Sequence, residues 1–161
     1  MIDKDALPYR PCAGILILNR AGQVFVGQRL DTEVEAWQPP QGGIDPGEDG
    51  TAAALRELGE ETGIAPDKVT LIAEGPGDFF YDLPDELIGR IWRGKWRGQR
   101  QRWFLFRFHG TDSDINIATA HPEFRAWRWV DPHEVVDLAV EFKRQLYRDV
   151  MAAFAARLVP Q

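Results

Sequence analysis

The pattern of hydrophobic residues predicts a hairpin near the start of the chain and a buried central strand later. Within residues 11–29, two runs rich in β-branched and aromatic residues flank the turn "NRAG", which contains Asn19 and Gly22. Two such runs around a turn are typical of a β-hairpin. Residues 102–108, "RWFLFRF", form a nearly continuous apolar run, which indicates a strand buried on both faces.

Shorter patterns predict further strands and one long loop. Residues 68–75 predict a strand, and residues 78–84 predict a short strand or a loop that ends at Pro84. Residues 124–130, "FRAWRWV", alternate between apolar and polar positions, as in a strand with one solvated face. Residues 35–48, "EAWQPPQGGIDPGE", are rich in proline and glycine, so we expect them to form a loop throughout.

Two segments have the composition and period of helices. Residues 49–62 include the good helix formers of "TAAALREL", and Gly63 suits the position just past a helix end. Gly59 costs about 1 kcal/mol relative to alanine, and close packing is the only reason that the sequence suggests for it. Apolar residues recur with helical period in residues 141–158, which predicts the second helix. These recurring residues are Phe142, Leu146, Tyr147, Val150, Met151, Phe154 and Leu158.

The elements together fit one domain. The chain has 161 residues, enough to bury a sizeable core, and it contains no internal repeat or linker. Strands and helices interleave without a regular βαβ order. We therefore expect an α/β fold, with a mixed sheet packed between helices, in a single domain over residues 1–161.

Composition is that of an ordinary globular protein, with 44% apolar and 27% charged residues. No apolar run approaches the roughly 20 residues that a transmembrane helix needs, and the first residues lack the features of a secretory signal. The single cysteine, Cys12, lies in an apolar run, so we expect it to be small and buried rather than paired in a disulfide. These features predict a cytoplasmic protein without membrane contact, and nothing in the sequence points to a stable protein partner.

Charge is unevenly distributed along the chain. The net charge of −6 argues against a protein that binds nucleic acid through bulk electrostatics. However, residues 45–61 contain six acids and one base, whereas residues 90–102 contain six bases and no acid. The basic segment also contains Trp92 and Trp96, and Trp103 directly follows it. Cations interleaved with indoles suit an anionic nucleotide, although a solvated edge loop would have the same composition.

Three glutamates of the acidic segment share one helix face. Glu57, Glu60 and Glu61 project together because residues three or four apart are neighbours on a helix, and each like-charged pair costs roughly a few tenths of a kcal/mol. A divalent cation such as Mg²⁺ or Mn²⁺ would explain the cluster, since these ions prefer oxygen ligands. The alternative is a solvated acidic face. Arg56 and the preceding glycine-rich loop favour the cation, because the arginine can orient a carboxylate and the loop backbone can approach an ion closely.

This segment resembles the Nudix box, G-x5-E-x7-R-E-U-x-E-E-x-G-U, in which U is aliphatic. The matching residues are Gly42, Glu48, Arg56, Glu57, Leu58, Glu60, Glu61, Gly63 and Ile64. The resemblance implies the Nudix fold, an α/β/α sandwich with a mixed central sheet. It also implies hydrolysis of a nucleoside diphosphate linked to another group, with two or more Mg²⁺ or Mn²⁺ ions. The implied metal ligands are Glu57, Glu60, Glu61 and a backbone carbonyl of Gly42 or Gly43. Arg56 would orient the carboxylates, and Glu48 would support the helix.

Similarity beyond the box covers most of the chain. The segments "YRPCAGILILNRAGQVFVGQR", "WQPPQGGID", "RGQRQRWF", "HPEFRAWRWV" and "FKRQLYRDVM" resemble the bacterial RNA pyrophosphohydrolases, which have also been described as dinucleoside polyphosphate hydrolases. Plant diadenosine tetraphosphate hydrolases are similar, and Tyr81 matches a tyrosine of the diadenosine-type members. The resemblance implies a 5′-triphosphorylated RNA or a dinucleoside polyphosphate as the substrate. Tyr81 and Gln99 are expected to contact it.

The resemblance also implies roles for residues further from the box. Arg10 and Lys143 match residues that hold the phosphate chain, whereas Arg29 and Phe142 match a pair that sandwiches a nucleobase. Glu123 matches an acid that binds a further metal ion or takes part in proton transfer. Plainer interpretations stay open: Phe142 in the helix core, Arg10 and Lys143 as surface charges, and Glu123 as a solvated turn residue.

The implied reaction is attack on a phosphorus atom by a water that the metal ions activate. Triphosphorylated RNA would yield pyrophosphate, and diadenosine tetraphosphate would yield ATP and AMP. The candidates for the proton acceptor are Glu57, Glu60, Glu61 and Glu123. No covalent intermediate is expected, because no serine or cysteine has a base beside it. The three histidines, His109, His121 and His133, are scattered and are expected to take no part.

Two other functions stay open. The first is an enzyme that cleans the nucleotide pool by hydrolysing free nucleoside triphosphates, although the basic segment with its tryptophans favours a longer substrate. The second is a non-catalytic nucleotide- or RNA-binding module. The complete set of box glutamates argues against this second function.

Overall fold

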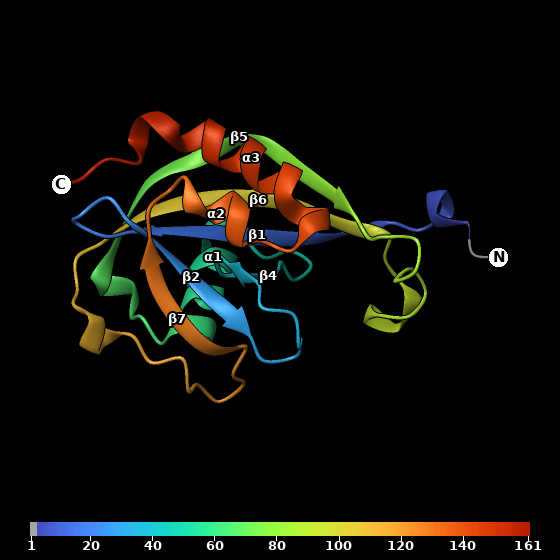
Figure 1. Cartoon of the computed structure of the whole chain (residues 1–161), viewed down its shortest axis with the longest axis horizontal. Coiled ribbons are helices and arrows are strands. Elements are labelled where there is room, and N and C mark those ends of the chain that lie inside the picture. Colours follow the sequence, from blue (N-terminus) through green and yellow to red (C-terminus); the bar gives the residue numbers. More distant parts are fainter. Residues whose placement is uncertain (1–2) are drawn as a thin grey trace.

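The computed structural model describes residues 3–161 and has helices on both faces of a mixed sheet of seven strands (Figure 1). The strands are β1 (Tyr9–Leu18), β2 (Val24–Arg29), β3 (Trp37–Gln38), β4 (Gln41–Gly43), β5 (Val69–Asp82), β6 (Gly98–Phe108) and β7 (Phe124–Val130). The helices are α1 (Gly50–Thr62), α2 (Glu134–Leu138) and α3 (Arg144–Phe154). Since α1 covers one face and α3 the other, the predicted α/β/α sandwich is confirmed.

The core lies on both sides of β1 and β6, which form the parallel pair of the sheet. Every other strand pair is antiparallel among the residues described. Successive side chains of β1 face opposite helices: Ile15 and Ile17 pack beside α1, whereas Leu16 and Leu18 pack beside α3. Burial on both faces explains the continuous apolar runs, and it confirms the predicted central strand, which begins earlier than expected, at Gly98.

Both ends of α1 follow from local chemistry. The side chain of Asp49 accepts a hydrogen bond from the backbone N–H of Ala52, and Gly63 ends the helix with a left-handed φ of 72°. The helix predicted at residues 49–62 is therefore confirmed. The expectation of close packing at Gly59 is wrong, because a Cβ atom there would meet only the carbonyl oxygen of Ile64, at an ordinary 3.8 Å.

Residues 37–43 pair with both β1 and β2, at a distance from the turn that joins these two strands. The predicted hairpin is present, and Leu18 lies opposite Val24 next to the turn. Further along, β2 pairs with β3 and β1 pairs with β4. The expectation of an uninterrupted loop at residues 35–48 is therefore wrong in part. Two short strands form there because each has a partner distant in sequence, and the prolines between them keep both strands short.

β5 is one long strand where two elements had been expected. It runs from Val69 to Asp82 and pairs with β6 throughout, with register shifts between Leu71 and Ala73 and between Glu74 and Asp78. The second shift contains the run "GPG", which explains why the sequence predicts two separate elements on either side of it.

The C-terminal helix is shorter than the predicted residues 141–158. α3 is flanked by single 3₁₀ turns at Glu141–Lys143 and Ala155–Arg157. The five-residue α2 was not predicted, because it is too short to show a helical period. Within residues 3–161, no helix is long and apolar enough to span a bilayer. Cys12 is buried as expected, and burial raises the pKa of its thiol to about 11.

Candidate active site

Arg56 holds three glutamates of the box and a backbone carbonyl of β4. Its Nε and Nη2 donate to the two carboxylate oxygens of Glu48, at 2.9 and 2.8 Å. Its Nη1 donates to Glu57 at 2.9 Å and to Glu60 at 3.3 Å, and its Nη2 donates to the carbonyl oxygen of Gly43 at 2.9 Å. The hydrogen bonds from Arg56 lower the pKa of Glu48 to about 2. One guanidinium group therefore ties α1 to β4.

Two of the box carboxylates, Glu61 and the partly buried Glu57, lie away from solvent without full compensation of their charge. Glu61 is 4% exposed, and its Oε2 has no hydrogen-bond partner in the described part of the chain. Burial raises the pKa of Glu61 well above its ordinary value, and the charges of Glu57 and Glu123 raise it further. Burial also raises the pKa of Glu57, despite its hydrogen bond with Arg56. A buried carboxylate without a partner is unfavourable unless a cation accompanies it.

The glycines of β4 allow close approach by charged side chains. A Cβ atom on Gly42 would lie 2.0 Å from the carboxyl carbon of Glu57, so only glycine fits there without displacing this carboxylate. A Cβ atom on Gly43 would lie 2.8 Å from Nη2 of Arg10. The backbone of β4 is thus in direct contact with one acid and one base of the site.

These groups line a cavity of about 390 Å³, which we call the carboxylate cavity. Its charged and amide-bearing residues include Glu57, Glu60, Glu61, Glu123, Arg10, Arg29 and Gln99. Every box glutamate expected to bind metal is therefore at one site, together with Glu123, which the sequence places far from the box. Acids and bases both line this cavity, a composition suited to an anion accompanied by a cation.

The donor set of the carboxylate cavity fits a hard divalent cation. Glu57 and Glu61 offer carboxylates, Gly43 offers a carbonyl, and the buried oxygen of Glu61 that accepts no hydrogen bond is free to bind such an ion. No three His, Cys, Asp or Glu side chains within residues 3–161 form a group that could hold an ion by themselves. Arg56 draws Glu57 and Glu60 toward itself. Magnesium keeps several waters and binds substrate phosphates, so fewer protein ligands suffice.

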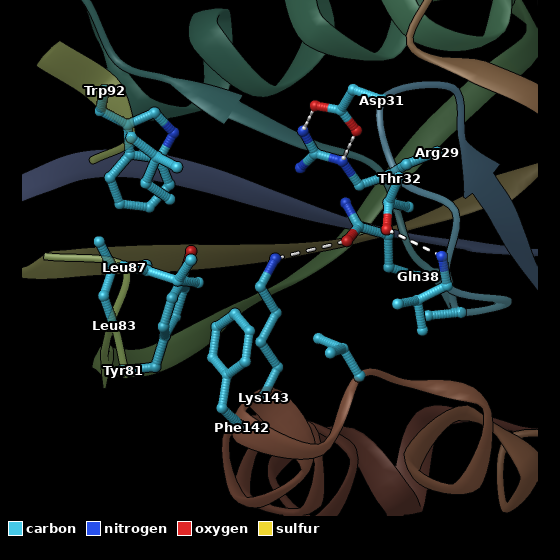
Figure 2. A pocket seen from close by; sticks show the side chains of 14 residues that line it. Arg29, Asp31, Thr32, Gln38, Tyr81, Leu83, Leu87, Trp92, Phe142 and Lys143 are labelled. Atoms are coloured by element: carbon cyan, nitrogen blue, oxygen red, sulfur yellow. Dashed lines mark hydrogen bonds and ion pairs between the residues drawn. The ribbon is translucent and has the colours of Figure 1, made fainter. Parts of the chain in front are cut away.

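A second cavity, of about 420 Å³, adjoins the first, and we call it the apolar cavity. Arg29, Asp31, Gln38 and Trp92 line both cavities. Figure 2 shows Phe142 and Lys143 projecting into the apolar cavity from the start of the C-terminal helical region, with Arg29 and Asp31 on the far side. The structure therefore brings Arg29 and Phe142 to one cavity, as the predicted base-binding pair requires.

Lys143 is a buried cation, and the interpretation of it as a surface charge is wrong. It is 6% exposed, and its Nζ donates to Oε1 of Gln38 at 3.4 Å. Burial, with a smaller contribution from the positive charge of Arg29, lowers the pKa of Lys143 to about 8. Lys143 lines the apolar cavity, and Gln38 connects it to the carboxylate cavity.

Two aromatic rings stand beside Lys143. Its Nζ lies 5.2 Å from the ring centre of Tyr81, and the rings of Tyr81 and Phe142 are 5.9 Å apart. Tyr81 is buried, and its hydroxyl has no hydrogen-bond partner among residues 3–161. Phe142 is only half-buried, which leaves part of its ring free to contact a ligand.

The basic segment 90–102 does not form one basic surface. Arg97, Arg100 and Arg102 form ion pairs with acids on neighbouring elements, and Trp103 is fully buried in the core. Trp92 is the member that lines both cavities, and its backbone adopts a left-handed φ of 52°, which is uncommon for a bulky residue.

Sequence reasoning missed Asp31 and Gln38. Asp31 forms an ion pair with Arg29, and Gln38 accepts a hydrogen bond from Lys143. The acid two residues after Arg29 was a usable signal for the first pair. The second pair joins residues 105 positions apart, and no pattern in the sequence indicates it.

Comparison with known proteins agrees with this geometry. The NUDIX domain model matches residues 8–150. A protein from Sphingopyxis alaskensis named RNA pyrophosphohydrolase is 65% identical over 154 residues, which cover 96% of this chain and 98% of the relative.

Two solved structures share the fold. The structure of a C. elegans Ap4A hydrolase binary complex aligns with a TM-score of 0.66 at 24% identity, over 91% of this chain and 98% of that one. A bifunctional NMN adenylyltransferase/ADP ribose pyrophosphatase from Francisella tularensis, complexed with AMP and a manganese ion, aligns with a TM-score of 0.62 at 19% identity, over 91% of this chain and 42% of that one. Because the domain match spans most of the chain and the relative is similar over nearly its full length, this chain belongs to the NUDIX family.

Proposed function

We propose that this protein is a hydrolase that removes pyrophosphate from the 5′ end of triphosphorylated RNA. The observation that carries the proposal is the junction of the two cavities at Arg29, Gln38 and Trp92. One ligand can place its phosphates among the glutamates and a nucleobase against Phe142. The 65% identity to a protein named RNA pyrophosphohydrolase supports this substrate class.

The reaction uses Mg²⁺ or Mn²⁺, with two or more ions in the carboxylate cavity. The residues that would hold them are Glu57, Glu60, Glu61, Glu123 and the backbone carbonyl of Gly42 or Gly43. Bound divalent cations lower the pKa of a coordinated water and neutralise charge that develops on phosphate oxygens. The orphaned oxygen of Glu61 and the contact between Gly42 and Glu57 support this assignment.

The protein's own groups position the phosphate chain and remove the proton. Arg10 forms no ion pair within residues 3–161 and lies against Gly43, so its guanidinium is available to a phosphate. Arg56 keeps Glu57 and Glu60 beside the loop carbonyl. Burial raises the pKa of Glu57 and of Glu61, which makes each carboxylate a stronger base than an exposed glutamate.

The apolar cavity binds a nucleobase of the substrate. Arg29 offers a guanidinium plane and Phe142 a half-exposed ring, two surfaces that stack well on a base. Lys143 and Tyr81 lie beside this position, and each carries a hydrogen-bond donor.

Hydrolysis of diadenosine tetraphosphate to ATP and AMP is the second candidate function. The same carboxylates and phosphate-binding groups suit a dinucleoside polyphosphate, and Tyr81 lies in the apolar cavity, where it can contact one of the two bases.

An RNA substrate places the enzyme in the cytoplasm, where its action would initiate RNA turnover. The proposal requires no membrane and no stable protein partner.

A competition for turnover tests the assignment. Triphosphorylated RNA, diadenosine tetraphosphate and ATP are supplied together, first with Mg²⁺ and then with Mn²⁺, and the products are separated by chromatography. We expect pyrophosphate release from RNA to have the highest kcat/KM. A decisive preference for ATP would replace the proposal with a pool-cleaning enzyme.

The variant Glu61→Gln distinguishes an enzyme from a binding module. It should lose metal-dependent turnover while still binding the oligonucleotide. Wild-type protein that binds triphosphorylated RNA and never hydrolyses it, with either metal, would show that the function is binding alone.

A further inference from the structure

Three side chains of β6 form a chain of hydrogen bonds that leads to the carboxylate cavity. Nε1 of Trp103 donates to Oε1 of Gln101 at 2.8 Å, and Nε2 of Gln101 donates to Oε1 of Gln99 at 2.8 Å. The three residues face the same side because they alternate along one strand. Each is at most 1% exposed, so solvent cannot substitute for a missing partner.

Trp103 sets the direction of this chain. An indole N–H can only donate, so the Gln101 amide must turn its oxygen toward Trp103 and its NH₂ group toward Gln99. Gln99 must then turn its own oxygen toward Gln101. The reversed arrangement would place two donors against each other at Trp103. Although the two ends of an amide have nearly the same shape, only one orientation of each glutamine satisfies the chain.

The last group in this series of hydrogen bonds is the NH₂ group of Gln99. Gln99 lines the carboxylate cavity, whereas Gln101 and Trp103 do not. No residue of the described chain, 3–161, accepts a hydrogen bond from Nε2 of Gln99. Gln99 lies beside Arg10 in the parallel ladder and opposite Tyr81 in the antiparallel ladder, which places its amide next to the cation most available to phosphate.

We propose that Trp103 and Gln101 are positioning residues that fix Gln99 with its NH₂ group toward the cavity, where it donates to a phosphate oxygen of the substrate. Phosphate oxygens only accept hydrogen bonds, so an amide oxygen at this position would repel them. The inference rests on the proposed polyphosphate substrate. It means that Trp103 and Gln101 affect the affinity for the substrate although neither residue contacts it.

The variant Gln101→Glu tests the direction of the chain. An ionised carboxylate accepts from Trp103 with one oxygen and from Gln99 with the other, so Gln99 must reverse and present its oxygen to the cavity. The matched variant Gln101→Met removes both hydrogen bonds of residue 101 and leaves the Gln99 amide free to adopt either orientation. We expect Gln101→Glu to raise KM for triphosphorylated RNA about tenfold or more, and Gln101→Met to raise it less. In both variants kcat should change little.

Binding of inorganic pyrophosphate in the presence of Mg²⁺, measured by calorimetry, provides a readout that does not require turnover. Its Kd should follow the same order: wild type, then Gln101→Met, then Gln101→Glu. Both effects should vanish in a Gln99→Met background, because no amide remains to be oriented. Thermal unfolding confirms that each variant is folded. If the glutamate variant does not fold, the methionine variant alone tests the inference in both backgrounds.

Several results would overturn the inference. These are a folded Gln101→Glu variant whose Kd matches that of Gln101→Met, an unchanged Kd in Gln101→Met, or effects that persist in the Gln99→Met background. By contrast, pyrophosphate binding that follows the expected order in a protein inactive on triphosphorylated RNA would leave the inference intact and reject the proposed function.

Discussion

Arg29 and Asp31 are joined by two parallel hydrogen bonds, from Nε to Oδ1 at 2.7 Å and from Nη2 to Oδ2, where the carboxylate cavity meets the apolar cavity (Figure 2). A two-point contact of this kind fixes the plane of a guanidinium group as well as its place. Asp31 therefore fixes the orientation of the Arg29 guanidinium where the two cavities meet.

Removing this contact should weaken substrate binding and leave the chemical step intact. We predict that Asp31→Ala raises KM for triphosphorylated RNA roughly fivefold, because exposed ion pairs of this type contribute about 1 kcal/mol or less. Steady-state kinetics check this, with Glu33→Ala as the control. Glu33 is an exposed acid of the same loop with no ion pair in the described chain. If both variants raise KM equally, the effect of Asp31→Ala comes from the change in net charge and not from the contact with Arg29.

Phe142→Ala should impair oligonucleotide substrates selectively. Loss of base stacking is worth about 1–3 kcal/mol, so we predict a rise in KM of roughly tenfold or more for RNA, with Mg²⁺-dependent pyrophosphate binding unchanged. The control is Phe80→Ala, because Phe80 is 51% exposed on β5 and lines neither cavity. Unchanged kinetics, together with a lowered Tm, would place the Phe142 ring in the core.

Gly42→Ala should disrupt metal binding. The added methyl group would collide with the carboxylate of Glu57, which must then move away from β4. We predict at least a tenfold loss of Mn²⁺ affinity, measured by electron paramagnetic resonance, and a comparable loss of kcat. A variant with normal Mn²⁺ affinity would show that Glu57 is not a ligand in this position.

Gly59→Ala should stabilise the protein without altering activity. The new Cβ atom has room, so the gain is the helix propensity of alanine, about 0.5–1 kcal/mol. Chemical denaturation should show a higher midpoint with an unchanged slope. A lower midpoint would contradict this prediction and would mean that alanine at position 59 destabilises the folded protein despite the space around it.

Lys143 predicts a pH dependence of substrate binding. It is charged below its pKa of about 8 and neutral above it, so affinity for triphosphorylated RNA should fall as pH rises through about 8. Lys143→Met should remove this step from the pH profile of Kd.

Stability should change with pH in the opposite direction. The folded-state pKa of Lys143 lies below the ordinary value of 10.5, so the folded state binds fewer protons than the unfolded state between about pH 8 and 10.5. The cost of burying the charged form is therefore full below about pH 8 and is relieved as pH rises. Lys143→Met should be more stable than the wild type at pH 7, by an amount that shrinks toward pH 10. A constant difference would contradict the lowered pKa.

The box helix and its glutamates could be predicted because the relevant geometry is local. Helical period alone places Glu57 and Glu61 on one face, and Gly63 marks the C-terminal end of α1. The central strands were equally readable, since burial on both faces leaves a continuous apolar run. The Nudix resemblance then supplied Glu123 and Arg29, whose place at the site no local pattern indicates.

The parts that sequence reasoning missed depend on contacts between distant segments. β3 and β4 form only because β1 and β2 diverge beside them. Lys143 lies at the end of an apolar helix face and reads as an ordinary surface cation, yet the walls of the apolar cavity bury it. In the same way, alternation predicts that Gln99 and Gln101 share a face, but the direction of their hydrogen bonds requires the position of the Trp103 indole.

Residues 37–43 are hydrogen-bonded to β2 on one side and to β1 on the other, so the backbone that approaches the glutamates is part of the sheet. Much of the apolar cavity, by contrast, is built from connecting segments, such as residues 31–36 and 83–92. Selectivity for a new nucleotide can therefore arise by exchanging these connections, while the rigid framework that breaks the phosphoanhydride bond is inherited unchanged.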